Sequence, residues 1–240
     1  MNTKTILLGT IMFLASSSDV FSSEQTNQLK IDNSTTALLI TDPQNDFLAE
    51  TGSAFELVKD NLKIVGTIGN IESLFKEAKK SNMSVFVSPH HYFPHDSKWK
   101  NRGALQKTIH NINMFKMSHP INQTNFDGSG ADFLPIYKKY IYDGKTTIST
   151  PHKIYGPDTN DLLLQLRKQG IQTVIIGGMA ANLCTDSHMR ELIEHGFDVI
   201  MVKDAVGAPG EAAYNAALTN YSLIANAVVT TKEAIQLIRE

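Results

Sequence analysis

The sequence is poor in cysteine, in net charge and in long apolar runs, and each of these absences excludes a class of protein. It has one cysteine in 240 residues, which excludes intrachain disulfides and metal centres built from several thiolates. The formal net charge is −2 and the pI is near 6.4, so we predict no nucleic-acid partner. After the N-terminus no apolar run is long enough to span a bilayer, so we predict no membrane partner. With 42% apolar residues, an ordinary globular protein remains.

The N-terminal segment has the features of a targeting signal. Lys4 supplies a positive charge, and the short apolar stretch over residues 6–15 is followed by small and polar residues. We therefore predict a signal peptide over residues 1–22, an N-terminal extension over residues 23–33, and one domain over residues 34–240. A signal peptide implies export, and we expect the periplasm as the destination. A buried N-terminal helix is the alternative interpretation.

Short apolar runs alternate with amphipathic segments along the rest of the chain. The predicted strands cover residues 36–41, 84–88, 146–150, 172–176, 198–202 and 227–230. The predicted helices cover residues 60–81, 159–169, 184–195 and 211–225, and Thr231 is the expected cap of a last helix. This alternation predicts an α/β fold with three layers, α/β/α, around a mostly parallel six-stranded sheet of Rossmann-like type. Residues 90–145 lack clear periodicity, which is typical of a functional loop.

Three residues that can carry chemistry follow three of the predicted strands. Asp42 follows the first strand, Lys153 the third and Cys184 the fourth, at the sheet edge where parallel sheets bind ligands. A helix start favours a thiolate, a carboxylate can accept the thiol proton, and an ammonium stabilises the negative charge. The alternatives are a buried apolar cysteine, a turn-forming aspartate and a solvated lysine. The placement of all three at strand ends favours a nucleophile with its partners.

Two motifs in this sequence resemble those of the isochorismatase-like cysteine hydrolases, which include nicotinamidases and N-carbamoylsarcosine amidohydrolases. The first is Leu39-Ile-Thr-Asp-Pro-Gln-Asn-Asp-Phe47, and the second is Ile176-Gly-Gly-Met-Ala-Ala-Asn-Leu-Cys184. A further match covers residues 197–205, and the resemblance extends over about residues 34–235. It implies the isochorismatase-like hydrolase fold and a homo-oligomer, since many relatives are dimers or larger.

The resemblance also implies which residues form the active site. It implies a catalytic triad of Asp42, Lys153 and Cys184, and an oxyanion hole made by the backbone N–H groups of Ala180 and Cys184. A cis peptide bond is implied between Met179 and Ala180. Four side chains are expected to contact the substrate: Phe47, Gln44, Tyr155 and Asn182.

The sequence departs from the family pattern at two places. Gly156-Pro157 stands where an aromatic and small-residue stretch usually follows the lysine. Nicotinamidases bind a metal through an Asp-x-His pair after the second strand, and this chain has a His and a Tyr at those positions. We therefore predict no metal and no other cofactor. A different metal site made by His90, His91 and His95 is the alternative.

These predictions combine into a hydrolase that cleaves a C–N bond in a small amide or carbamoyl-type substrate. Cys184 attacks the carbonyl, a thioester forms, and water releases the product. The expected partners are therefore a small-molecule substrate and other copies of the chain. Two alternatives remain on the same fold: a vinyl-ether hydrolase of the isochorismate type, which needs no cysteine nucleophile, and a non-catalytic binding protein.

Overall fold

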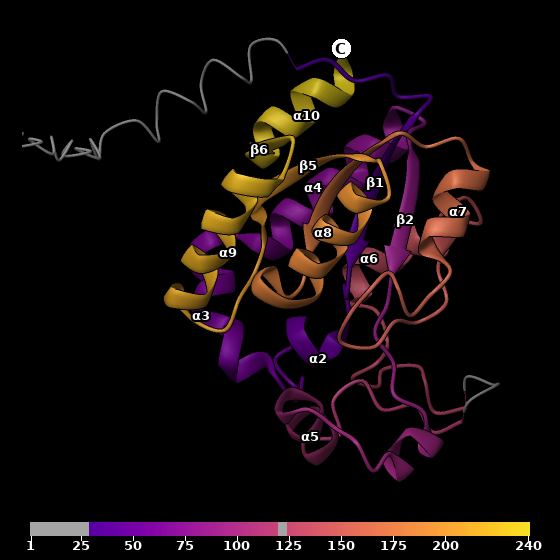
Figure 1. Ribbon diagram of the computed structural model, residues 1–240, viewed down its shortest axis with the longest axis vertical. Coiled ribbons are helices and arrows are strands. Elements are labelled where there is room, and N and C mark those ends of the chain that lie inside the picture. Colours follow the sequence, from indigo (N-terminus) through magenta and orange to yellow (C-terminus); the bar gives the residue numbers. More distant parts are fainter. Residues whose placement is uncertain (1–28, 120–123) are drawn as a thin grey trace, which may run out of the picture.

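A six-stranded sheet forms the centre of the computed structural model, which describes residues 29–119 and 124–240. The strands are β1 (Thr36–Thr41), β2 (Ser84–Ser88), β3 (Thr147–Ile148), β4 (Thr173–Gly178), β5 (Asp198–Val206) and β6 (Ala227–Val229). Their order across the sheet is β3-β2-β1-β4-β5-β6, and every neighbouring pair is parallel (Figure 1). The predicted parallel sheet is confirmed. The predicted signal peptide over residues 1–22 lies outside the described residues.

The pairing of β1 with its two neighbours aligns the carboxyl ends of these three strands. β1 is buried along its whole length, as expected for a strand covered on both faces. In register, Thr41 at the end of β1 pairs with Ser88 of β2 and with Gly178 of β4. The loops that follow these three residues therefore leave the same carboxyl edge side by side.

Helices cover both faces of the sheet and bury alternate residues of its strands. The helices are α2 (Asn45–Leu48), α3 (Phe55–Val65), α4 (Thr67–Lys80), α5 (Ala104–Asn111), α6 (Pro135–Ile141), α7 (Leu162–Lys168), α8 (Asp186–Glu194), α9 (Glu211–Ile224) and α10 (Thr231–Arg239). On one face Leu38 and Ile40 pack with residues of α3, α4, α6 and α10, and on the other Leu39 packs with residues of α7, α8 and α9. This arrangement confirms the predicted three layers. No helix in the described ranges combines the length and apolarity needed to cross a membrane.

The structure differs from the predicted helices most clearly at one break and at one cap. The helix expected over residues 60–81 is two helices, α3 and α4, which meet at Gly66 with φ of +76°. Glycine adopts this left-handed conformation without the steric cost of a Cβ atom, so the chain turns there although the apolar spacing continues. The cap of α10 is Thr230, not Thr231, because the Thr230 hydroxyl accepts a hydrogen bond from the backbone N–H of Glu233.

The connection after β2 contains structure that the sequence did not predict. Its first part, residues 90–119, is called the covering segment and includes a short 3₁₀ helix, η1 (Pro94–Lys98), and α5. Figure 1 shows α5 at the opposite end of the molecule from α10, with α2 between it and the sheet. The buried Asp46 carboxylate accepts hydrogen bonds from the backbone N–H groups of Ser53, at 3.0 Å, and Phe115, at 2.5 Å. The bond from Phe115 fixes the covering segment to α2, which follows β1.

Candidate active site

Four buried side chains meet at the carboxyl edge of the sheet. Asp42 follows β1, His90 follows β2 and His152 follows β3, while Cys184 lies in η2 (Ala181–Thr185), a π-helical turn between β4 and α8. One potential ligand atom from each side chain lies within 4.8 Å of the others. The edge predicted from the carboxyl ends of the strands therefore carries a compact group of an acid, two imidazoles and a thiol.

Asp42 forms the turn after β1 and also presents its carboxylate to this group. Its φ of +45° is in the left-handed region, which aspartate tolerates better than most residues. Its backbone N–H donates to Ser88 O at 3.0 Å, and its carbonyl accepts from Gln44 N at 2.8 Å. The turn-forming role that was the alternative interpretation thus coexists with a position in the site.

His152 is the direct partner of the Asp42 carboxylate. Its Nε2 lies 2.7 Å from Asp42 Oδ1, and its Nδ1 is hydrogen-bonded to the carbonyl oxygen of Lys153. A carbonyl oxygen is an acceptor only, so His152 Nδ1 donates to Lys153 O. The bond between His152 Nε2 and the Asp42 carboxyl needs one further proton, and where Asp42 is ionised that proton is on His152, which is then an imidazolium.

Lys153 points away from the predicted triad partners. Its Nζ donates to Asp96 Oδ2 at 2.5 Å and to His91 O at 2.8 Å, and it lies over the ring of Phe93. No hydrogen bond or ion pair joins its ammonium to Asp42 or Cys184 among the described residues. Consecutive residues of an extended segment face opposite sides, so the residue before it, His152, turns inward instead.

The residue that contacts Asp42, His152, directly precedes Lys153, which the sequence predicted. The available signal was the period of two in extended backbone: His152 forms a parallel bridge with His90, which places it in sheet-like register just beyond β2 and β3. A second signal in the sequence is Gly156. A Cβ atom at Gly156 would lie 2.5 Å from the His188 ring and 3.0 Å from the His152 ring. Glycine there makes room for the two imidazoles.

The Cys184 thiol is buried beside an acid and two backbone donors. Burial raises the pKa of the thiol, the Asp42 carboxylate raises it further, and the backbone N–H groups of Ala180 and Cys184 lower it. The resting form at neutral pH is therefore the thiol, with a carboxylate in place to accept its proton. The cis peptide bond expected between Met179 and Ala180 is present.

Two neutral imidazoles pack around this centre. His90 Nδ1 lies 3.9 Å from Cys184 Sγ and 4.0 Å from Asp42 Oδ2, and burial holds the pKa of His90 well below its usual range. His188 Nδ1 donates to Cys184 O at 2.7 Å, and burial likewise lowers the pKa of His188. His188 therefore fixes the backbone of the thiol-bearing turn rather than its sulfur.

The four expected substrate contacts have different positions. Phe47 lines a cavity that reaches Cys184. The buried Gln44 amide donates to His90 O at 3.0 Å and accepts from His90 N at 2.8 Å, so it positions the backbone of His90. Tyr155 is 46% exposed and its hydroxyl donates to Glu191. Asn182 lies in η2 but does not line that cavity.

The histidines of the alternative metal site do not come together. His95 is exposed and lies 3.3 Å from Asp96 Oδ1, away from His90. In the described part of the chain, the side chains whose potential metal-ligand atoms lie close together are those of the strand-end group: Asp42, His90, His152 and Cys184. In this group the carboxylate and one imidazole are already bonded to each other.

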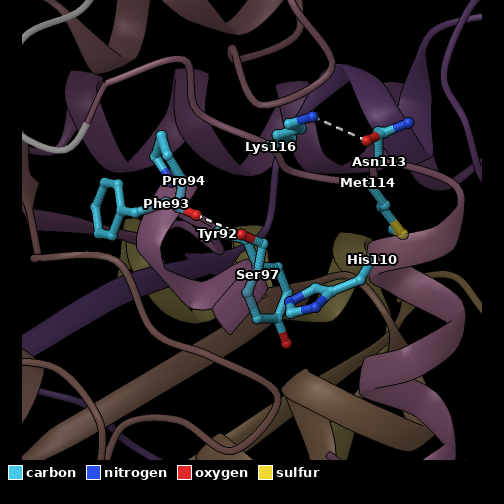
Figure 2. A pocket seen from close by; sticks show the side chains of 8 residues that line it. All are labelled: Tyr92, Phe93, Pro94, Ser97, His110, Asn113, Met114 and Lys116. Carbon is cyan, nitrogen blue, oxygen red and sulfur yellow. Dashed lines mark hydrogen bonds between the residues drawn. The ribbon is translucent and has the colours of Figure 1, made fainter. Parts of the chain in front are cut away.

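Two cavities adjoin the covering segment. One has a volume of about 110 Å³ and reaches Cys184, Ala180 and Phe47. The other has a volume of about 270 Å³ and lies between residues 92–97 and residues 110–116. Figure 2 shows this outer cavity, with Lys116 bonded to Asn113 and with the ring of His110 beside Tyr92. The first cavity is the one next to the thiol.

Comparison with known proteins places these observations in a family. The sequence profile of the isochorismatase domain matches residues 36–233. Isochorismatase family protein 2B of Dictyostelium discoideum is 25% identical over 212 residues, which cover 88% of this chain and 80% of that protein.

Solved structures with the same fold include two named enzymes. The cysteine hydrolase from Pseudomonas syringae pv. phaseolicola 1448A matches with a TM-score of 0.71 and 21% identity, over 88% of this chain and 96% of that one. N-carbamoylsarcosine amidase from Thermoplasma acidophilum matches with a TM-score of 0.55 and 18% identity, over 82% of this chain and 96% of that one. At these identities the likeness shows a shared fold.

Proposed function

The chain belongs to the isochorismatase family of hydrolases, and from that premise we propose that it cleaves the C–N bond of a small amide or carbamoyl-type substrate with Cys184 as nucleophile. The observation that carries the proposal is the surroundings of the Cys184 sulfur. An acidic acceptor, Asp42, and two backbone donors, from Ala180 and Cys184, act on one buried thiol. The fold shared with a cysteine hydrolase and with an amidase supports the same chemistry.

The first half of the proposed reaction forms a thioester. Asp42 takes the proton of the Cys184 thiol as the sulfur attacks the substrate carbonyl carbon. The developing oxyanion takes the hydrogen bonds of the Ala180 and Cys184 N–H groups, because those donors already point at the sulfur. The C–N bond then breaks, and the proton held by Asp42 leaves with ammonia or an amine.

The second half returns the enzyme to its starting state. Water attacks the thioester carbonyl, gives a proton to Asp42 and releases the carboxylic or carbamic acid, and that proton returns to the Cys184 sulfur. His152 holds Asp42 in place throughout by its hydrogen bond and charge. In this proposal His152 has the role that the family resemblance gave to Lys153, and the third member of the triad is an imidazolium.

The experiment is to replace Cys184 with alanine and to measure ammonia release over a panel of small amides, ureas and carbamoyl compounds. We expect the wild type to release ammonia from at least one class, and Cys184→Ala to lose at least 10⁴-fold in kcat/KM. A matched surface variant, Thr219→Ala on α9, controls for preparation and is expected to have wild-type activity. Full amide hydrolysis by Cys184→Ala would contradict the proposal, and retained cleavage of a vinyl ether would indicate the isochorismate-type reaction instead.

A further inference from the structure

We infer that the substrate's acyl group is short, aliphatic and uncharged, an inference that rests on the proposed function and names the substrate class of the same site. The cavity of about 110 Å³ reaches Cys184 and Ala180, so a carbonyl attacked by the sulfur extends its acyl group into this space. The walls of the cavity therefore select the acyl group.

The cavity walls are almost entirely apolar. Among the described residues no Lys, Arg, Asp or Glu lines the cavity, and the polar side chains that line it are those of His90, Thr108 and Cys184. Larger apolar side chains are contributed by α2, α3, the covering segment and η2: Phe47, Val58, Ile109, Met114, Phe115 and Leu183. Apolar walls favour an acyl group whose surface is apolar.

A charged acyl group finds no partner in this cavity. Burial lowers the pKa of His90 far enough that its ring is neutral and supplies no counter-charge. The Lys153 ammonium is bonded to Asp96 and His91 O, and Lys153 does not line the cavity. A carboxylate or ammonium that leaves water without a partner is strongly disfavoured. Substrates of the carbamoylsarcosine type, which carry a carboxylate, are therefore expected to react far more slowly than uncharged amides.

The volume limits the length of the acyl group. An apolar cavity of about 150 Å³ takes benzene, and a water molecule occupies about 30 Å³ of the liquid. A cavity of about 110 Å³ is smaller than the benzene-binding one. It holds roughly three to four groups of the size of a water or a methylene. Amides from propionamide to butyramide fill it.

The first experiment compares kcat/KM for acetamide, propionamide and butyramide with that for two charged analogues, succinamate and 4-aminobutyramide. Each methylene is expected to raise kcat/KM about fourfold, from the transfer of apolar surface out of water. Both charged analogues are expected to react at least 100-fold more slowly than butyramide. Turnover of succinamate within a factor of three of butyramide would overturn the inference.

A pair of leucine variants tests the cavity itself. Leu57 on α3 lines the cavity and is 62% exposed, so Leu57→Lys adds a cation at the rim without disturbing the core. Leu164 lies on α7, in the helical layer on the other face of the sheet, and is 55% exposed, so Leu164→Lys is the matched control. We expect the succinamate-to-butyramide ratio of kcat/KM to rise about tenfold in Leu57→Lys and to stay unchanged in Leu164→Lys. An equal ratio in the two variants would place the acyl group elsewhere and overturn the inference.

Alkylation separates failure of this inference from failure of the proposed function. Iodoacetamide and iodoacetate react with Cys184 without turnover, and each rate is divided by the rate for free cysteine. We expect the neutral reagent to be favoured at least 100-fold. If no amide is hydrolysed but this preference holds, the proposed function fails and the apolar cavity stands. If amides are hydrolysed but neither chemistry discriminates by charge, the inference fails and the proposed function stands.

Discussion

Two neighbouring basic residues belong to two different regions of the site. His152 lies in the inner cluster with Asp42 and Cys184, where all three side chains are buried. Lys153 lies further out, in an ion pair with Asp96. Its side chain is 20% exposed and contacts aromatic rings of the covering segment. The inner pair, His152 with Asp42, has no contact with solvent, whereas the outer pair, Lys153 with Asp96, keeps partial contact. Breaking the inner pair is therefore expected to cost far more.

The largest expected difference between the two regions comes from matched glutamine substitutions. His152→Gln keeps a donor for Asp42 but removes the positive charge, and we expect kcat/KM to fall by about 10²–10⁴, the range seen when a residue that orients a catalytic base or acid is altered. Lys153→Gln removes a charge that faces Asp96, and we expect a fall of less than tenfold. Ammonia release from the preferred amide measures both.

Thermal unfolding of the same two variants is the control for misfolding. Activities are compared at a temperature at which both variants remain folded, and the ratio of the two losses is the decisive quantity. A larger loss in Lys153→Gln than in His152→Gln would show that the comparison is inverted and that the lysine acts on the thiol, as the family resemblance implied.

The sequence predicted the parts of the site that depend on strand ends alone. Asp42 and Cys184 follow buried apolar runs, and parallel strands bring their carboxyl ends to one edge. It did not predict His152, because the choice between adjacent residues depends on which side of an extended segment faces inward. The role of Gln44 was not predicted either, because it depends on a tertiary contact. The Gln44 side-chain amide makes two hydrogen bonds with the backbone of His90.

The sequence also predicted those parts of the fold that depend on local signals. Strand existence and order of elements follow from apolar runs and their alternation, which are local signals. The break between α3 and α4 at Gly66 was missed because the apolar spacing runs through it. Residues 90–119 gave no periodic signal, since α5 is short and the segment is held by hydrogen bonds such as that from Phe115 N to Asp46. Such bonds link residues far apart in the sequence.

The second expected effect is a loss of stability in acid caused by neutral imidazoles near the inner cluster. Burial lowers the pKa of His90 and His188 well below the usual value and that of His91 to about 4. The unfolded chain binds a proton at each below about pH 6.5, and the folded chain does not. The stabilisation is therefore complete above pH 6.5 and is lost as the pH falls towards the folded pKa.

As the pH falls below 6.5, each such histidine lowers the free energy of unfolding by up to about 1.4 kcal/mol per pH unit, so three give a slope of about 4 kcal/mol per pH unit near pH 5. Urea unfolding at pH 6, 5.5 and 5 measures the slope. His91→Gln is expected to reduce the slope by about 1.4 kcal/mol per pH unit. His95→Gln is the matched control, because the exposed His95 ring is hydrated in both states. An unchanged slope in His91→Gln would mean that His91 is protonated in the folded protein.

The smallest expected effect lies far from both regions, at the start of α10. The Thr230 hydroxyl caps this helix by accepting from Glu233 N at 3.3 Å, and the Glu233 carboxylate accepts from Thr230 N at 2.7 Å. Thr230→Ala is expected to lower the free energy of unfolding by about 1 kcal/mol and to leave kcat/KM unchanged. Thr219→Ala, within α9, is the matched control and is expected to lose no stability, since alanine favours a helix interior. Because α10 lies at the opposite end of the molecule from α5 (Figure 1), a fall in kcat/KM in Thr230→Ala would show that the site depends on the whole sheet rather than on its carboxyl edge.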